Sequence, residues 1–574
     1  MSSSRTNFTT LPFELQMQIF HDYFKVDGGY AFNGDSEKLT TANGKPIDLA
    51  LMYTCRSIAT QTKGMPLSLN TVHFSTVYHR DWTPLAGCLN FVTVLYPLLV
   101  ADMVIRLEPF ITPDMYSELT TKFPDFVPEL RRRSETHQEL LGEVEPREPD
   151  NILASPRLGD ALSWIRDFQH GTPRPDANYP FTRSSLSPVF FGVRANQGTP
   201  FYALRLLAEK RPDEFAQLVF GTFPHWVDTH PAHEFLELGF NLWDIPSRSE
   251  LSLVTSRLDV DFIWQMVDQW HYKPPRSYDS SSPYDPLHRG TRCREKVRFS
   301  AAAVSIRFLG GLTVDQRLQI RNVTLHEDFA AAGEPPFHAQ GLAPFFRENS
   351  RLRVERRVSA MRCISEPGRL GYDTPGEVAW WLQEPRHPKH ANYLTFRNSM
   401  PSSHFPICLA QWLLSALAVP EAGIPAESFT FVLEGGPYLD FCTDLFQQTV
   451  HRDVAWQKAY QASLQRGLLA RWPRAAELVV EGFVEAIEHL INSTSFLRSD
   501  FNTGHPWDWE NLVEEKTGFS QFTWVRSFYM HIFLPIDFPP AMDYTSILAD
   551  NYEIQTESEY SQPHCSREGS EEAG

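Results

Sequence analysis

The chain has 574 residues and a formal net charge of −18, with 70 Asp and Glu residues against 52 Lys and Arg residues. This length exceeds what one hydrophobic core normally holds, so we expect several domains. The acidic balance excludes unspecific binding to nucleic acid or to anionic membranes, because both need an excess of Lys and Arg.

The seven cysteines are sparse, and no pair has the C-x-x-C spacing. Free thiols in a reduced intracellular compartment are the simplest interpretation. The first residues, MSSSRTNFTT, contain no apolar stretch of the kind that a signal peptide needs. We therefore expect a cytoplasmic or nuclear protein.

Two apolar stretches, residues 87–105 and 405–420, were compared with membrane spans. The first is long enough but contains Asp102, and a central Asp costs about 2.5–3.5 kcal/mol in a bilayer. The second is shorter than the roughly 20 residues that a span needs. Both predict buried helices, and we expect no membrane partner.

The N-terminal elements follow from local patterns. Residues 9–24 predict a helix, because apolar side chains recur every three or four positions. Residues 25–46 are polar and contain glycines, which predicts a loop or hairpin. Asp48 is placed to cap a second helix that ends at Gly64. Residues 70–76, NTVHFST, alternate polar and apolar side chains and predict a strand.

Together these elements resemble the F-box-like modules common in fungal proteins. The shared pattern is Leu-Pro-x-Glu-Leu at a helix start, an Ile-Phe pair one turn later, Cys-Arg in a second helix and an Asn-Thr-x-x-Phe strand. Here the pattern is carried by Leu11, Pro12, Glu14, Leu15, Ile19, Phe20, Cys55, Arg56, Asn70, Thr71 and Phe74. A middle run from RFLGGL through IRNVTLHED to RLRVERRV resembles a block of no settled activity in the same fungal group.

The resemblance implies a function in protein–protein interaction rather than catalysis. An F-box docks on the small adaptor of a cullin-type ubiquitin ligase, and the rest of the chain selects the protein to be ubiquitinated. An apolar helix stripe that fits a partner groove agrees with this role. The residues we expect at the adaptor face are Leu11, Pro12, Leu15, Ile19 and Phe20. We expect no catalytic residue and no cofactor.

One departure from the pattern keeps a second hypothesis open. A compact F-box passes almost directly from its first helix to the next, whereas this chain inserts residues 25–46. The insertion predicts a self-packed fold in which the stripe lies against Leu51, Cys55 and Ile58, and the protein is then a scaffold outside any ligase. The burial of Leu15 and Phe20 distinguishes the two hypotheses, as does the burial of Leu11.

The whole chain predicts an α+β, mainly helical, multidomain fold. No sequence period is present, so we expect loop-rich packing rather than a repeat solenoid. The predicted segments are a disordered N-terminus (1–8), the F-box-like module (9–80), a helical extension (81–130), a charged linker (131–149), a mixed α/β middle region (150–366), a mainly helical C-terminal region (367–549) and a disordered acidic tail (550–574).

A metal-dependent enzyme is a remote alternative. It would use the dense run of possible ligands in FPHWVDTHPAHEF, namely His225, Asp228, His230, His233 and Glu234. Two prolines in this run prevent the helical spacing of a metalloprotease site. Helix capping by polar loop residues explains the run better, and we predict no metal site.

Two basic runs lack an obvious local partner. The first places Arg292, Arg294, Lys296 and Arg298 at every second position, and the second contains Arg351, Arg353, Arg356 and Arg357. Such runs can hold an acidic or phosphorylated partner segment, or the chain's own acidic tail. They can also be solvated strand edges that oppose aggregation. No aromatic residues interleave them, so we expect no nucleic acid partner.

Overall fold

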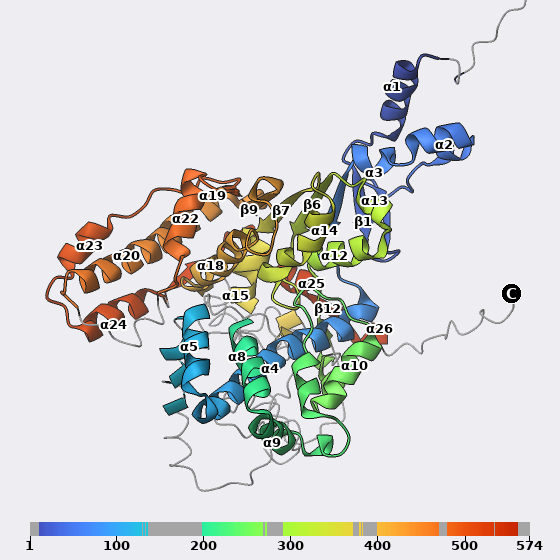
Figure 1. Ribbon diagram of the computed structural model, residues 1–574. Coiled ribbons are helices and arrows are strands. Elements are labelled where there is room, and N and C mark those ends of the chain that lie inside the picture. Colours follow the sequence, from blue (N-terminus) through green and yellow to red (C-terminus); the bar gives the residue numbers. More distant parts are fainter. Residues whose placement is uncertain are drawn as a thin grey trace, which may run out of the picture.

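A computed structural model describes residues 11–124, 198–267, 270–272, 291–370, 399–469, 479–532 and 534–560. It also describes residues 8, 126–128, 130, 131, 134, 135, 378, 379, 381 and 382. The fold is α+β and mainly helical, as the sequence predicts (Figure 1). Within these residues one seven-stranded sheet forms the centre of the molecule.

The strand order of this sheet follows the order of the chain. Six strands run parallel and each pairs with its neighbour in sequence order, while a hairpin adds β2 at one edge. Along the sheet the strands are β10 (Leu497–Ser499), β9 (Phe429–Glu434), β7 (Arg353–Ser359), β6 (Asn322–Glu327), β3 (Thr71–Ser75), β1 (Tyr30–Asn33) and β2 (Lys38–Thr41).

Neighbouring parallel strands in chain order also occur in solenoids, but these strands begin at residues 30, 71, 322, 353, 429 and 497, so they follow no regular repeat. Successive units of a solenoid contact only their neighbours, as these strands do. Insertions of very different length separate the strands: β6 and β7 begin at residues 322 and 353, whereas β3 begins at residue 71. The sheet also joins strands from three of the predicted segments.

Helices pack against one face of the sheet. Phe308 of α12 lies 5.5 Å from Phe74 of β3, and Trp412 of α18 lies 4.7 Å from the guanidinium of Arg356 on β7. Most inward positions of the strands are apolar and buried, as the alternating pattern predicts, and Glu327 and Arg356 are buried charged exceptions. The helices along the sheet are α12 (Ala301–Gly311), α14 (Ala343–Glu348), α18 (His404–Leu417) and α22 (Phe483–Asn492) (Figure 1).

The opposite face carries polar, half-buried side chains. His73, Glu355 and Arg357 lie on this face, on β3 and β7. Parallel sheets normally have helices on both faces. In the part of the chain that the structure describes, the helices that pack against the sheet lie on the Phe74 face.

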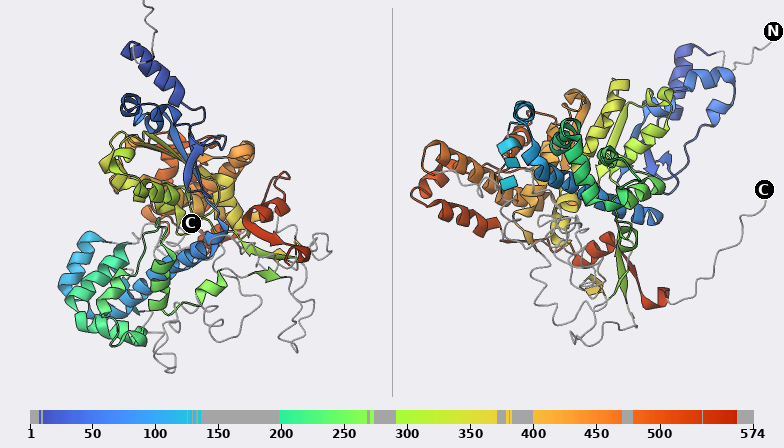
Figure 2. Two further views of the ribbon diagram at one scale, coloured as in Figure 1. Left: turned by 90° about the vertical axis from the view of Figure 1, so that its right-hand side faces the viewer. Right: turned by 60° about the horizontal axis from the view of Figure 1, so that its bottom comes forward.

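Two helical lobes extend from the sheet (Figures 1 and 2). The insertion between β3 and β6 contains α4 (Thr83–Leu107), α5 (Pro113–Lys122), α8 (Gly198–Lys210), α9 (Pro212–Thr222), α10 (Arg248–Arg257) and α11 (Ile263–Met266). The C-terminal lobe contains α19 (Leu439–Leu445), α20 (His451–Gln465), α23 (Trp509–Glu515) and α24 (Gln521–Ile532). Shorter elements are α13 (Val314–Arg317), α15 (Glu366–Leu370), α25 (Tyr544–Asn551), β8 (Ser399–Pro401) and β11 (Pro535–Asp537).

Among the described helices, one at residues 80–110 is long and apolar enough to cross a membrane. Within the protein, 82% of its apolar window is buried, which is typical of a core helix. Its Asp102 pairs with Arg106 at 2.7 Å, so the acidic group is neutralised where it lies. The second apolar stretch forms α18, which packs inside the protein.

The acidic tail departs from the prediction. Disorder was expected from residue 550, but β12 (Tyr552–Gln555) pairs antiparallel with β5 (Arg292–Glu295), which also pairs with β4 (His271–Tyr272). A short helix, α26 (Glu557–Tyr560), follows. Arg294 forms an ion pair with Glu553, so the first basic run binds the chain's own acidic segment. Residues 561–574 and most of the predicted linker lie outside the described residues.

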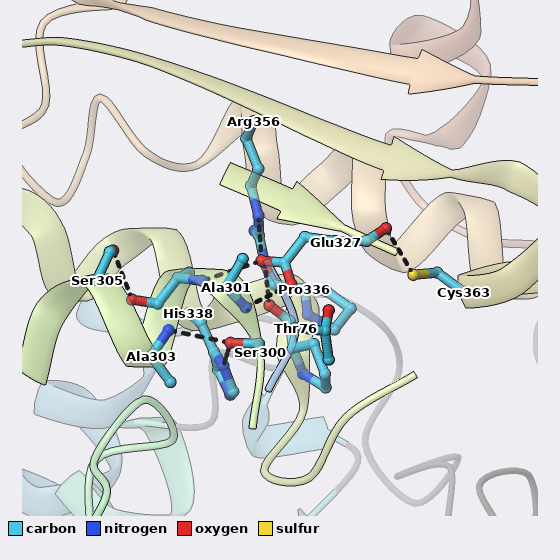
Figure 3. Close-up of polar contacts among 12 residues, drawn as sticks. Thr76, Ser300, Ala301, Ala303, Ser305, Glu327, Pro336, His338, Arg356 and Cys363 are labelled. Atoms are coloured by element: carbon cyan, nitrogen blue, oxygen red, sulfur yellow. Dashed lines mark hydrogen bonds and ion pairs between the residues drawn. The ribbon is translucent and has the colours of Figure 1, made fainter. Parts of the chain in front are cut away.

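A buried ion pair ties the sheet to its helices (Figure 3). Arg356 of β7 donates from Nε and Nη2 to Oε1 of Glu327 on β6, at 3.1 and 2.8 Å, and both side chains are 1% exposed. Glu327 also accepts hydrogen bonds from the backbone N–H groups of Ala301 and Ala302 at the start of α12. The Arg356 Nη1 donates to the Pro336 carbonyl at 2.9 Å.

Replacing Arg356 by Met leaves the Glu327 carboxylate buried without its cation. Loss of one member of a buried pair costs about 3–5 kcal/mol, and we expect this decrease in the free energy of unfolding. The double variant Arg356→Met, Glu327→Gln retains an acceptor for α12 without a charge, so it should lose less. Urea denaturation followed by circular dichroism measures both, and equal losses in the two variants would contradict the ion-pair account.

Candidate docking surface

A small lobe carries the F-box-like residues. It contains α1 (Phe13–Phe24), a 3-10 turn at Ala50–Tyr53, α2 (Arg56–Thr62) and α3 (Met65–Leu69). Figures 1 and 2 show α1 at the outer end of this lobe. The second predicted helix is thus divided into the 3-10 turn and α2, because the chain turns at Cys55. A further helix, α3, begins directly after Gly64, where the prediction ended the helical segment.

Helix α1 has two apolar sides, and the lobe covers one of them. Phe20 and Phe24 are buried against Ile58. Leu15, Ile19 and Tyr23 follow one another at intervals of one helical turn on another side of the helix. These three side chains are 47%, 42% and 37% exposed. We call Leu15, Ile19 and Tyr23 the α1 stripe.

The predicted partner residues therefore divide into two groups. Leu15 and Ile19 lie in the α1 stripe, Pro12 is exposed just before the helix, and Leu11 is half-buried. Phe20 is fully buried, so its assignment to the docking face is wrong and it belongs to the core of the lobe. A period of three and four positions identifies apolar residues, but it does not tell which of two adjacent stripes faces the core.

Three exposed apolar residues were not predicted from the sequence to contact a partner. Tyr23 continues the α1 stripe by one turn, and its spacing from Ile19 could have revealed it. Phe13 at the start of α1 and Tyr53 in the 3-10 turn are 61% and 81% exposed. Their exposure depends on the tertiary fold and has no sequence signal.

The insertion at residues 25–46 forms a hairpin that joins the sheet. Its strand β1 pairs with β2 and with β3. The insertion therefore extends the sheet while Leu15 and Ile19 stay half-exposed. Between the hairpin and the end of α1 lies a cleft of about 460 Å³, lined by Tyr23, Tyr30, Lys45 and Asp48 among others.

Tyr23 connects the α1 stripe to the 3-10 turn. Desolvation raises the pKa of the Tyr23 hydroxyl, and a hydrogen bond to Asp48 raises it further. The Ala50 N–H group and Tyr23 in turn lower the pKa of Asp48. Tyr23 is thus a neutral donor held at the edge of the cleft.

The histidine-rich run does not assemble a metal site in the described part of the chain. His225 contacts the backbone carbonyl of Arg257 at 3.1 Å, and Glu234 is held by the Arg257 guanidinium at 2.9 Å. His230 lies 3.9 Å from the same carboxylate. These contacts join two 3-10 turns to α10, and a cation already occupies the carboxylate.

The described residues also contain a buried serine–histidine pair (Figure 3). His338 Nε2 donates to the Gly333 carbonyl at 2.5 Å, so Nδ1 accepts from the Ser300 hydroxyl at 2.6 Å. The Ser300 Oγ accepts from the Ala303 N–H group and thereby caps α12. Both side chains are almost fully buried, so a substrate cannot reach them.

The thiol nearest to a histidine is not an activated nucleophile. Cys408 lies 3.5 Å from His404 Nε2, which already contacts the Ile364 carbonyl at 2.8 Å. Burial raises the pKa of Cys408 to about 12, whereas a reactive cysteine needs a lowered pKa. The α1 stripe is therefore the strongest candidate site among the described residues.

No known protein family, no curated protein and no solved structure matches this chain.

Acidification should destabilise the protein through His338. Burial lowers its native pKa to about 3, whereas a histidine in the unfolded chain has a pKa of about 6.5. Between these values the unfolded state binds more protons, so the free energy of unfolding falls by up to about 1.4 kcal/mol for each unit that the pH decreases.

Urea denaturation at several pH values between these limits tests this, with His338→Gln as the comparison. The variant keeps a polar side chain without the titrating ring, so its stability should depend less on pH. An unchanged pH dependence in the variant would show that His338 does not cause the acid sensitivity.

Proposed function

We propose that the chain is a protein–protein interaction protein that serves a cullin-type ubiquitin ligase as substrate receptor. In this proposal the α1 stripe docks on the ligase adaptor, and the remainder of the chain selects a target protein. The observation that carries the proposal is the half-exposure of Leu15 and Ile19 beside a fully buried Phe20.

The two sides of α1 support docking over self-packing. The lobe fills its small core with Phe20, Phe24 and Ile58 and leaves the α1 stripe outside it. Exposed aliphatic side chains one turn apart are the anchors that a groove in a partner protein accepts. A scaffold that has no adaptor remains the second hypothesis, because a buried Phe20 shortens the docking face.

The activity in this proposal is positional. The chain would carry out no bond chemistry and would hold a target near the ubiquitin carrier, which raises the effective concentration of one for the other. This agrees with the described residues, where the polar clusters are occupied by structural hydrogen bonds.

Charges placed on the α1 stripe should prevent docking. We expect the variant Leu15→Asp, Ile19→Asp to bind a purified ligase adaptor at least about tenfold more weakly than the wild type, because two apolar anchors are lost. Isothermal titration calorimetry measures the affinity, and circular dichroism checks the fold.

The matched control is Leu253→Asp, Leu439→Asp, since these leucines are 55% and 43% exposed at other sites. The control should bind the adaptor like the wild type. If the wild-type chain does not bind the adaptor, the ligase proposal fails and the scaffold hypothesis takes its place.

A further inference from the structure

Three arginines gather where the parallel strands β6 and β7 begin. Arg351 and Arg353 are exposed and Arg321 is half-buried. The Arg353 N–H group donates to the Arg321 carbonyl at 2.7 Å, which places Arg321, directly before β6, beside the first residue of β7. Arg351 lies two residues before Arg353, in the turn that leads into β7. We call these three residues the arginine edge.

The other cations of the two basic runs are already used. Arg356 is buried against Glu327. Arg357 binds Glu355 at 2.6 Å and Glu434 at 2.5 Å. In the first run, Arg294 pairs with Glu553 of β12, and Arg292 donates to Gln555 of the same strand β12. The other arginines of the two runs thus bind partners within the chain, which distinguishes them from the arginine edge.

The arginine edge forms no ion pair with a described carboxylate. The acidic residues nearest in sequence are engaged elsewhere: Glu348 binds Arg317 through two hydrogen bonds of 2.6 and 2.9 Å, and Glu355 binds Arg357. In a chain with a net charge of −18, three neighbouring arginines that pair with no described carboxylate form a local excess of positive charge.

Backbone carbonyls hold two of these arginines in place. Arg353 donates through Nη1 to the carbonyls of Ser350 and Leu352, at 3.1 and 2.9 Å. Arg321 donates through Nη1 to the Leu318 carbonyl at 2.5 Å. A guanidinium has five N–H donors, so each of these side chains keeps donors for a ligand.

We propose that the arginine edge binds a phosphorylated segment of a partner protein. Phosphate oxygens match the planar fork of a guanidinium and accept paired, charge-assisted hydrogen bonds, which stabilises phosphate more than a single carboxylate. The polar face of the sheet, with the half-buried side chains of Glu355 and Arg357, begins at the same strands. This inference rests on the proposed function in one respect: the phosphorylated segment belongs to the target protein that the chain selects.

The test uses the full chain and a degenerate peptide pool with a fixed central phosphoserine, compared with the same pool containing serine. Fluorescence anisotropy should show tighter binding of the phosphorylated pool. The variant Arg321→Gln, Arg351→Gln, Arg353→Gln should weaken this binding by at least about tenfold, because several charge-assisted hydrogen bonds are lost. Replacing the three arginines by lysine keeps the charge but removes the fork and should restore binding only partly.

The matched control removes the same charge from exposed sites elsewhere, as Lys38→Gln, Lys45→Gln, Arg526→Gln. It should bind the phosphorylated pool like the wild type. Arg351→Gln serves alone if the triple variant does not fold, since the Arg351 side chain makes no hydrogen bond within the described residues.

Three results would overturn the proposal. They are equal binding of both peptide pools, an equal loss in the charge-matched control, and tighter binding of an RNA oligonucleotide at the same arginines. The variant Leu15→Asp, Ile19→Asp should keep phosphopeptide binding even though it loses the adaptor. Failure of adaptor docking and failure of the arginine edge are therefore measured separately.

Discussion

The pair formed by Glu327 and Arg356 is the interaction on which the sheet and its helices depend. It lies where β6, β7, the start of α12 and the first residues of the 3-10 helix Pro335–Leu342 meet. Two charges removed from water are stable only when almost every donor and acceptor has a partner. Any shift of α12 or of either strand would break several of these hydrogen bonds together. The pair therefore couples consecutive units of the sheet.

Local elements of this architecture could be predicted from the sequence. The helix over residues 9–24 and the strand over residues 70–76 follow from apolar spacing and alternation, and both are present as α1 and β3. The order of the strands in the sheet could not be predicted, because long insertions with helices of their own separate the strands in the chain. The partnership of Glu327 with Arg356 was equally hidden, since a run of four arginines does not show which member faces the core.

In the α1 stripe, too, the sequence predicts the element but not which of its residues are buried. The helix α1 and its apolar residues follow from spacing, but the division into a buried side with Phe20 and an exposed side with Leu15 depends on α2 and α3. The C-terminal tail gives the converse case. Its acidic composition predicts disorder, yet Glu553 forms an ion pair with the buried Arg294 of β5, and β12 pairs with β5.

The two proposed surfaces are close to one another in the fold. Lys63, at the end of α2, lies 3.3 Å from Asp315 in the turn that leads to β6 and Arg321. The lobe of α1 thus adjoins the end of the sheet where the arginine edge lies. A chain built in this way would hold an adaptor and a target near each other, as positional action requires.

The central claim is that the α1 stripe is covered by a ligase adaptor, and hydrogen–deuterium exchange of the full chain with and without that adaptor tests it most directly. Docking of the α1 stripe should slow exchange in residues 11–24 and around Tyr53, with little change in β6 and β7. Unchanged exchange in residues 11–24 under conditions where the adaptor is bound would contradict the claim.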